Sequence, residues 1–195
     1  MRKIILIMCL IIFPIFISAK EKINLDEYDT MNLIETIVSE NLNVKINNYK
    51  EKPDQVTIYL FRGLGCRYCK NFISFLNNLD KEYYNKIKLV SFDVWGNIKN
   101  EKLLSEISMF LEGKKVNGVP YIIIGEKTFE GYAEEYNEEI LKQIDKEYKK
   151  DNKIDIINKY NNTLENQFNK EEMKETLTQT VKTILFTSFV ISIVI

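Results

Sequence analysis

Histidine is absent from this chain of 195 residues, and cysteine, proline and tryptophan are scarce. Without histidine, catalysis by an imidazole acid or base and metal binding through imidazole are excluded. The 27 Lys and Arg residues are mixed with 28 Asp and Glu, for a net charge of −1. A chain this close to neutrality does not favour binding to nucleic acid. The length permits one domain with appendages.

Only three cysteines are present, and two of them, Cys66 and Cys69, form a Cys-x-x-Cys pair. Mononuclear zinc needs four ligands, which this chain could supply only by dimerising or by adding carboxylates. A purely structural disulfide between these two residues would close a very short loop and constrain the unfolded chain little. The pair is therefore best interpreted as a reversible dithiol. Cys9 lies in an N-terminal apolar segment and is interpreted as one of its hydrophobic residues.

The stretch around the cysteine pair organises the chain. Val56–Phe61 is β-branched and aromatic, which predicts a strand buried on both faces. Gly63 and Gly65 permit a sharp turn after it. A helix is predicted next, because apolar residues recur at helical spacing: Phe72, Ile73, Leu76 and Leu79.

This context predicts the chemistry of the pair. Cys66 is expected at or just before the helix N-terminus, where free N–H groups and the helix dipole favour a thiolate. Arg67 adds a positive charge that acts in the same direction. Cys69 follows about one helical turn later, close enough to form a disulfide with Cys66.

Val116–Tyr132 is the second informative stretch. Cys66-Arg67-Tyr68-Cys69 after a strand, followed later by Gly118-Val119-Pro120 and a further strand, resembles the thioredoxin superfamily. The resemblance covers roughly residues 31–148. It implies a cis Pro120 beside the cysteines, a substrate polypeptide bound by the backbone of Val119, and no bound cofactor. It also implies a strand–turn–strand hairpin at Gly125–Tyr132.

The sequence departs from the usual family pattern at two places. Arg67 and Tyr68 stand between the cysteines, and Tyr68 is expected to shape the substrate contact surface. Gly65 replaces the usual tryptophan before the first cysteine. Arg67 favours the reduced thiolate and hence oxidase or isomerase activity, whereas membrane-tethered proteins that resemble this one often act as reductases. The direction of electron flow is therefore left open.

The remaining pattern completes an α/β fold with a central mixed sheet flanked by helices. A strand is expected at Ile87–Val94, with Asp93 as a structural polar residue and Trp95 as a packing residue. The other expected elements are a helix marked by Met31, Ile34, Ile37 and Val38 and capped by Asp29 or Thr30, a strand at 42–46, a helix over Leu103–Leu111 that ends at Gly113, and a helix over Glu134–Tyr148.

The two ends are expected to direct the protein to a membrane. Residues 1–19 have the composition of a signal peptide, with cleavage after Ala19, or of an N-terminal anchor. Residues 20–148 are the thioredoxin-like domain, and 149–175 are a charged helical spacer, interpreted as a solvated stalk rather than an interaction helix. Residues 176–195 are expected to form a transmembrane helix, complete or truncated. This predicts attachment to the outer face of a bacterial membrane.

The expected function is thiol–disulfide exchange with envelope proteins through Cys66 and Cys69, with Arg67, Tyr68, Val119 and Pro120 contacting the substrate. A membrane electron-transfer partner is a further expectation, and no metal or nucleic acid is expected. Two alternatives stay open: a non-enzymatic binding module built on the same scaffold, and a chaperone that carries Cu(I) between the two thiolates.

Overall fold

The computed structural model describes residues 21–45 and 49–194, with side chains described as far as Ile184. The expected signal segment at 1–19, including Cys9, lies outside this range. A mixed sheet is built from β2 (Val56–Arg62), β3 (Ile87–Asp93), β4 (Tyr121–Ile124), β5 (Lys127–Glu130) and the very short β1 (Thr30–Met31). The spatial order is β1-β3-β2-β4-β5, with β2 and β3 parallel and the other pairs antiparallel.

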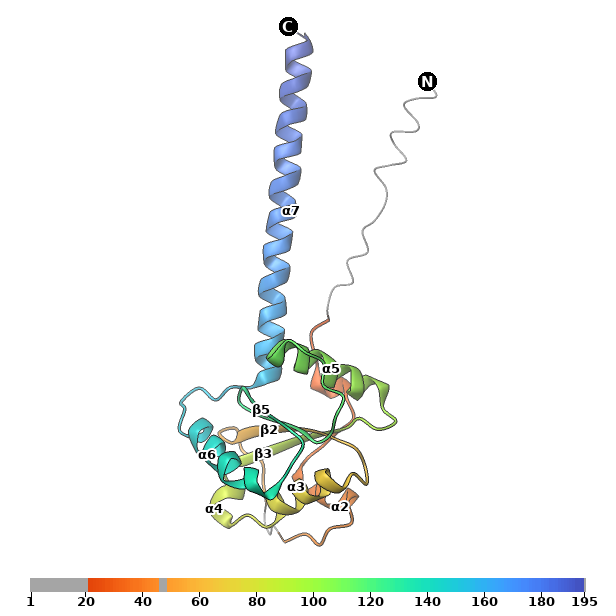
Figure 1. Ribbon diagram of the computed structural model, residues 1–195. Helices are drawn as coiled ribbons and strands as arrows, with labels where there is room; N and C mark the ends of the chain where they lie inside the picture. The colour runs from red at the N-terminus through yellow and green to blue at the C-terminus, as the bar shows by residue number, and fades with distance from the viewer. Residues whose placement is uncertain (1–20, 46–48, 195) are drawn as a thin grey trace.

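Helices cover both faces of this sheet (Figure 1). α2, α3 and α6 pack on one face, and α5 with the first turns of α7 packs on the other. The prediction of an α/β fold with a central mixed sheet is confirmed. The helical elements are η1 (Leu25–Glu27), α2 (Leu33–Ser39), α3 (Arg67–Asn77), α4 (Lys81–Tyr84), α5 (Ile98–Glu112), η2 (Glu134–Tyr136), α6 (Asn137–Tyr148) and α7 (Ile156–Val194).

β2 is the central strand because its side chains are apolar in both directions. Ile58 and Leu60 belong to the core under α2, α3 and α6. Tyr59 and Phe61 belong to the core under α5 and α7, where the Phe61 ring stacks on Phe92 with centroids 4.8 Å apart. A strand buried on both faces needs this continuous apolar run, as the sequence predicted.

The prediction of a strand at 42–46 is wrong for its described part, residues 42–45, which have no regular structure. The side chain of Asn77 explains this difference. Its Oδ1 accepts a hydrogen bond from Lys45 N–H at 3.0 Å, and its Nδ2 donates to the Asn43 carbonyl at 2.8 Å. These backbone groups are thus satisfied by a side chain of α3 instead of a neighbouring strand. β1 pairs with β3 at the edge of the sheet.

The first long helix also begins later than predicted. α2 is capped by Asn32, rather than by Asp29 or Thr30, and Asn32 forms a reciprocal capping box with Glu35. Its buried face carries Leu33 and Ile37, which are fully buried, whereas Val38, which was expected to mark this face, is 58 % exposed. The helix at Ile98–Glu112 ends as predicted, at Gly113 in the left-handed region with φ 70°.

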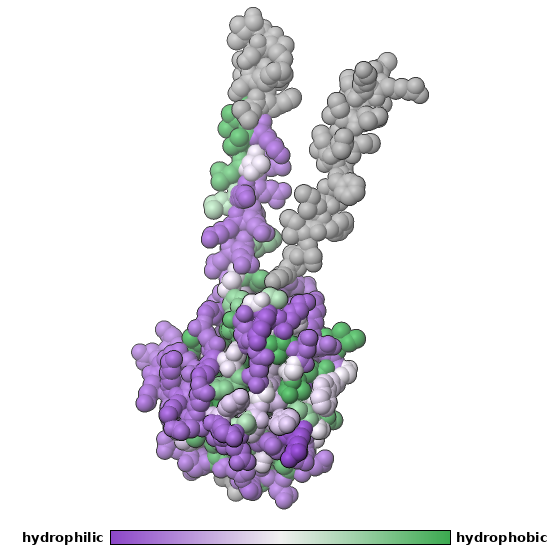
Figure 2. All heavy atoms as spheres, in the orientation of Figure 1, coloured by the Kyte–Doolittle hydropathy of each residue, from purple (hydrophilic) through white to green (hydrophobic). Residues whose placement is uncertain are grey.

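α7 differs from the solvated stalk that the charged spacer suggested. Its first turns are part of the domain, because Ile156, Ile157 and Tyr160 are buried against α5. Beyond these turns and as far as Ile184, α7 projects from the domain as a column of mostly hydrophilic residues with apolar patches (Figure 2). Among the residues whose side chains are described, 21–45 and 49–184, no helix combines the length and the apolar character needed to cross a bilayer. The exposed apolar residues of this column are Phe168, Met173, Leu177, Val181 and Ile184.

Candidate functional site

Cys66 and Cys69 lie at the start of α3, next to the C-terminal end of β2. Cys66 is the N-cap residue of α3, and the Cys69 N–H donates to its Sγ at 3.2 Å. The two residues are joined by a disulfide, with their Cα atoms 5.2 Å apart. Cys66 is 7 % exposed and Cys69 is fully buried. An attacking group from another molecule therefore has access to Cys66 only.

The helix N-terminus gives the Cys66 sulfur an electropositive environment. The first N–H groups of a helix have no partner within the helix, and one of them already points at this sulfur. When the disulfide is reduced, the same N–H group and the helix dipole favour the thiolate over the thiol. Arg67, the next residue, is exposed and adds a positive charge on the solvent side.

Val119 and Pro120 lie beside the cysteines, although they are far away in the sequence. The Val119 carbonyl oxygen is 3.9 Å from Cys66 Sγ, and the Val119–Pro120 peptide bond is cis. Pro120 is buried and Val119 is partly buried. The backbone of Val119 is thus placed next to the sulfur of Cys66.

The turn that leads to Cys66 is held by two contacts, one from the last residue of β3 and one from the loop that follows. Asp93 Oδ1 accepts hydrogen bonds from Leu64 N–H at 3.2 Å and from Trp95 N–H at 3.1 Å. The Trp95 ring lies so close to Gly63 that any Cβ at that position would overlap it. Gly63 O in turn accepts a hydrogen bond from Cys66 N–H at 3.0 Å. Asp93 is therefore a structural residue, as expected.

Exposed apolar side chains surround the buried disulfide. Tyr68 is 59 % exposed, Trp95 56 % and Leu64 54 %, although all three are large apolar residues. The structure places Val119, with Pro120 next to it in the chain, beside Cys66, while Arg67 and Tyr68 are exposed on the first turn of α3 between the two cysteines. Trp95, expected only to pack, both packs on Gly63 and presents a large surface to solvent. The only sequence signal for this exposed surface is the position of Trp95 just after the end of a strand.

Arg62 was missed by the sequence analysis. It is the last residue of β2 and is fully buried, with its guanidinium 2.7 Å from Glu40 Oε1 at the end of α2. Its other N–H groups reach Ser91 Oγ and Ser39 Oγ, each at 3.0 Å. This buried network joins β2, β3 and α2 below the turn that leads to Cys66. No local sequence signal marks it, because its partners are distant in the sequence.

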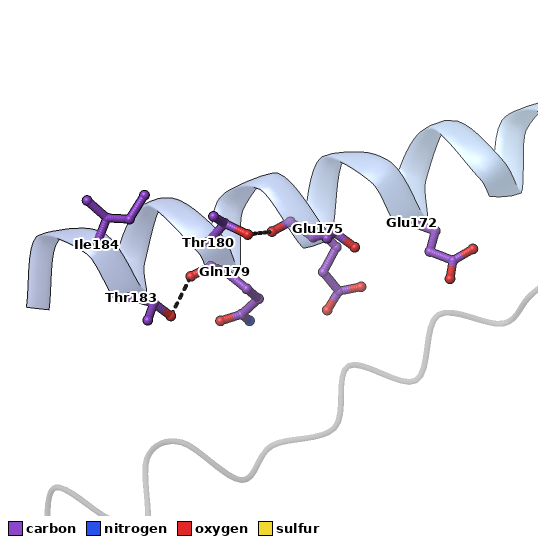
Figure 3. Close-up of a pocket in the computed structure, with 7 residues that line it drawn as sticks. Glu172, Glu175, Gln179, Thr180, Thr183 and Ile184 are labelled. Atoms are coloured by element: carbon purple, nitrogen blue, oxygen red, sulfur yellow. Dashed lines mark hydrogen bonds between the residues drawn. The ribbon is translucent and has the colours of Figure 1, made fainter. Parts of the chain in front are cut away.

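A hollow lies along α7, away from the cysteines, but it does not have the features of a reaction site (Figure 3). It follows one helix that projects away from α3 (Figure 1). Two of its threonine hydroxyls already donate to backbone carbonyls of the same helix. Within the described residues, no group of three or more Asp, Glu and Cys side chains is placed to hold a metal ion. The lining residues are Glu172, Glu175, Thr176, Gln179, Thr180, Thr183 and Ile184.

The fold and the site together define an α/β protein with a Cys-x-x-Cys pair at a helix N-terminus. No family model, curated protein or solved structure matches the chain. The chemistry that this site can perform therefore follows from its own geometry. One accessible sulfur, one buried sulfur within bonding distance and a helix N-terminus are the components of a reversible thiol–disulfide couple.

Proposed function

We propose that this protein is a thiol–disulfide oxidoreductase that exchanges disulfides with protein substrates through Cys66 and Cys69. The observation that carries the proposal is the asymmetry of the pair. Cys66 caps α3 and is slightly exposed, while Cys69 is fully buried one turn later. Attack by a substrate is directed to Cys66, and Cys69 is kept for the second, intramolecular step.

In the reducing direction, the Cys66 thiolate attacks one sulfur of a substrate disulfide. The substrate S–S bond breaks, a mixed disulfide forms and one substrate thiolate leaves. The Cys69 thiolate then attacks Cys66 Sγ and displaces the second substrate thiolate. Two electrons pass to the substrate, and Cys66 and Cys69 become the disulfide. The same steps in reverse oxidise a substrate dithiol.

A thioredoxin-like fold is part of the proposal. It is supported by the cysteine pair between the parallel strands β2 and β3, and by the cis Val119–Pro120 bond directly before β4. The Val119 carbonyl near Cys66 Sγ supports a role for this backbone in holding the substrate strand. Export, and attachment to a membrane that holds protein substrates and an electron-transfer partner, are proposed from the sequence of the two ends.

The first test is the reduction potential of the pair. The full-length chain with Cys9→Ser, purified in mild detergent, is equilibrated against dithiol and glutathione buffers. A reversible two-electron couple is expected. A strongly reducing potential would assign the protein as a reductase, and a strongly oxidising one as a disulfide donor. A pair that never cycles would refute the proposal and favour a non-enzymatic binding module.

Trapping in cells provides a matched comparison. Cys69→Ser is expected to accumulate mixed disulfides with envelope proteins, because the intermediate on Cys66 can no longer be resolved. Cys66→Ser should trap far less, since Cys69 is fully buried. Equal trapping by the two variants would contradict the assigned roles. Stoichiometric Cu(I) binding that both single substitutions abolish, without any trapping, would instead favour the copper chaperone.

A further inference from the structure

A groove lies beside Trp95, between the loop after β3 and the loop that leads to Pro120. It is lined by Val94, Trp95, Gly96, Glu101, Leu104 and Asn117. Glu101 is on the first turns of α5, and Asn117 lies two residues before Val119. Two residues span about 7 Å at most, so the groove is adjacent to the backbone that faces Cys66 Sγ.

The indole ring of Trp95 is presented to this groove in a fixed orientation. A Cβ on Gly63 would overlap Cδ2 and Cε2, the two atoms shared by the five-membered and six-membered rings. Gly63 therefore lies under the middle of one face of the ring. Asp93 binds the backbone N–H of Trp95, which holds the loop that carries the ring. Since Trp95 is 56 % exposed and one face of its ring lies on Gly63, the opposite face is open to solvent.

The groove combines that aromatic surface with a negative charge. Glu101 and Asn117 are both exposed, so their carboxylate and amide groups are accessible to a bound molecule. An aromatic face attracts cations through its quadrupole, most strongly for tryptophan, and a nearby carboxylate adds an ion pair. This chemistry suits a guanidinium or ammonium group better than an apolar or acidic side chain.

We infer that this groove is a specificity subsite that takes an arginine or lysine side chain next to the reactive cysteine of a polypeptide substrate. The inference rests on the proposed function, because it concerns the substrate of the same cysteine pair. The basic side chain lies on Trp95 and pairs with Glu101 while the substrate cysteine reaches Cys66. Arg67 and Lys70, both exposed on the first turn of α3, would attract acidic substrates instead. A preference for basic peptides therefore has to come from the groove.

The test measures single-step exchange with short peptides. The full-length chain with Cys9→Ser and Cys69→Ser, reduced and held in mild detergent, reacts with peptides whose only cysteine is a mixed disulfide with thionitrobenzoate. The residue on either side of that cysteine is Arg, Leu, Glu or Gly. Release of thionitrobenzoate gives the second-order rate constant, and Arg is expected to be about fivefold faster than Leu or Glu, as for an exposed cation–π contact.

Variants then locate the preference. Glu101→Gln should remove most of the advantage of Arg while leaving the Gly peptide unchanged. Trp95→Leu should lower the ratio of the Arg rate to the Gly rate, and this ratio is the readout because the same ring also packs on Gly63. The matched control is Phe168→Ala, an exposed aromatic residue on α7, which should change neither rate. A full Arg preference in Glu101→Gln, a Leu peptide as fast as Arg, or an unchanged ratio of Arg to Gly rates in Trp95→Leu would overturn the inference. A Gly peptide no faster with the wild-type pair than with free cysteine would instead refute the proposed function.

Discussion

Arg62 lies at the end of β2 with its guanidinium fully buried and paired with Glu40. Removing a charge from water is costly, and the cost is recovered only when the hydrogen bonds are complete. Four contacts satisfy this guanidinium: Glu40, Ser91 and Ser39, and the Met31 sulfur at 3.3 Å. The network fixes the strand end from which the Cys66 turn starts.

Breaking this pair from one side is expected to cost more than removing it altogether. Arg62→Met leaves the Glu40 carboxylate buried without a partner and should lower the free energy of unfolding by about 3–5 kcal/mol. Combining it with Glu40→Leu should recover much of that loss, because no uncompensated charge stays buried. Urea unfolding of the disulfide form, followed by circular dichroism, measures both. A single variant within about 0.5 kcal/mol of wild type would show that the pair is not holding the strand end.

Single residues of the site differ in how far the sequence predicts them. The positions of Cys66 and Cys69 follow from local spacing, since a strand, a turn and a helix in succession place them without any distant partner. The environment of Arg62 depends on residues from α2, β1 and β3. Trp95 likewise became informative only when the fold placed it on Gly63. Contacts between distant segments are where sequence patterns carry no signal.

Among the elements, α4 is tied to α6 by a polar cluster around Asp145. Lys86 Nζ lies 2.9 Å from Asp145 Oδ1 and 2.7 Å from Glu82 Oε1, and the Tyr83 hydroxyl donates to Asp145 Oδ2 at 2.9 Å. The hydrogen bond from Lys86 lowers the pKa of Asp145 below its ordinary value, although partial burial acts in the opposite direction. The hydrogen bonds to Glu82 and Asp145 raise the pKa of Lys86.

These shifts predict how stability depends on pH. A carboxyl whose pKa is lowered on folding stabilises the fold fully above its unfolded pKa, about 4, and loses this contribution as the pH falls through the folded pKa. Asp145→Asn should therefore be less stable than wild type at neutral pH, by roughly 1 kcal/mol or less for a partly exposed pair. The difference should shrink at acidic pH, well below the unfolded pKa of about 4, as the pH falls through the lowered pKa of Asp145 and the wild-type carboxyl is protonated. Urea midpoints of both proteins at the two pH values check this; a constant difference would contradict it.

Sequence patterns located most elements, and the exceptions share one cause. The strands at 56–61 and 87–94 were predicted because long apolar runs are local signals, and the hairpin at Gly125–Tyr132 was expected from the family resemblance. Residues 42–45 alternate like a strand, yet the Asn77 side chain takes their backbone hydrogen bonds. α2 starts at Leu33 because Asn32 and Glu35 form a capping box that outweighs the earlier polar residues. In each case a side chain that binds backbone groups decides whether the segment forms a helix, a strand or neither.

At the scale of the whole molecule, α7 closes the second face of the sheet and holds the N-terminal segment of the domain. Tyr59 on β2 donates its hydroxyl to Asp155 at 3.0 Å, just before α7 begins. Asn161 accepts from Ile23 N–H and donates to the Ile23 carbonyl, both at 2.7 Å. The described start of the domain, near residue 21, and a helix more than a hundred residues later are therefore joined.

This arrangement predicts that α7 contributes to stability only along its first turns. Ile157 is 3 % exposed in the core under α5, whereas Leu177, on the same helix, is 60 % exposed. Ile157→Ala should lower the free energy of unfolding by about 2–5 kcal/mol, because it removes buried methyl groups and leaves a cavity. Leu177→Ala should change it by less than about 0.5 kcal/mol. Both substitutions place alanine in the same helix, so a difference between them reports packing rather than helix propensity. Equal, small effects would mean that α7 stands free of the domain along its whole length, and the second face of the sheet would then need another cover.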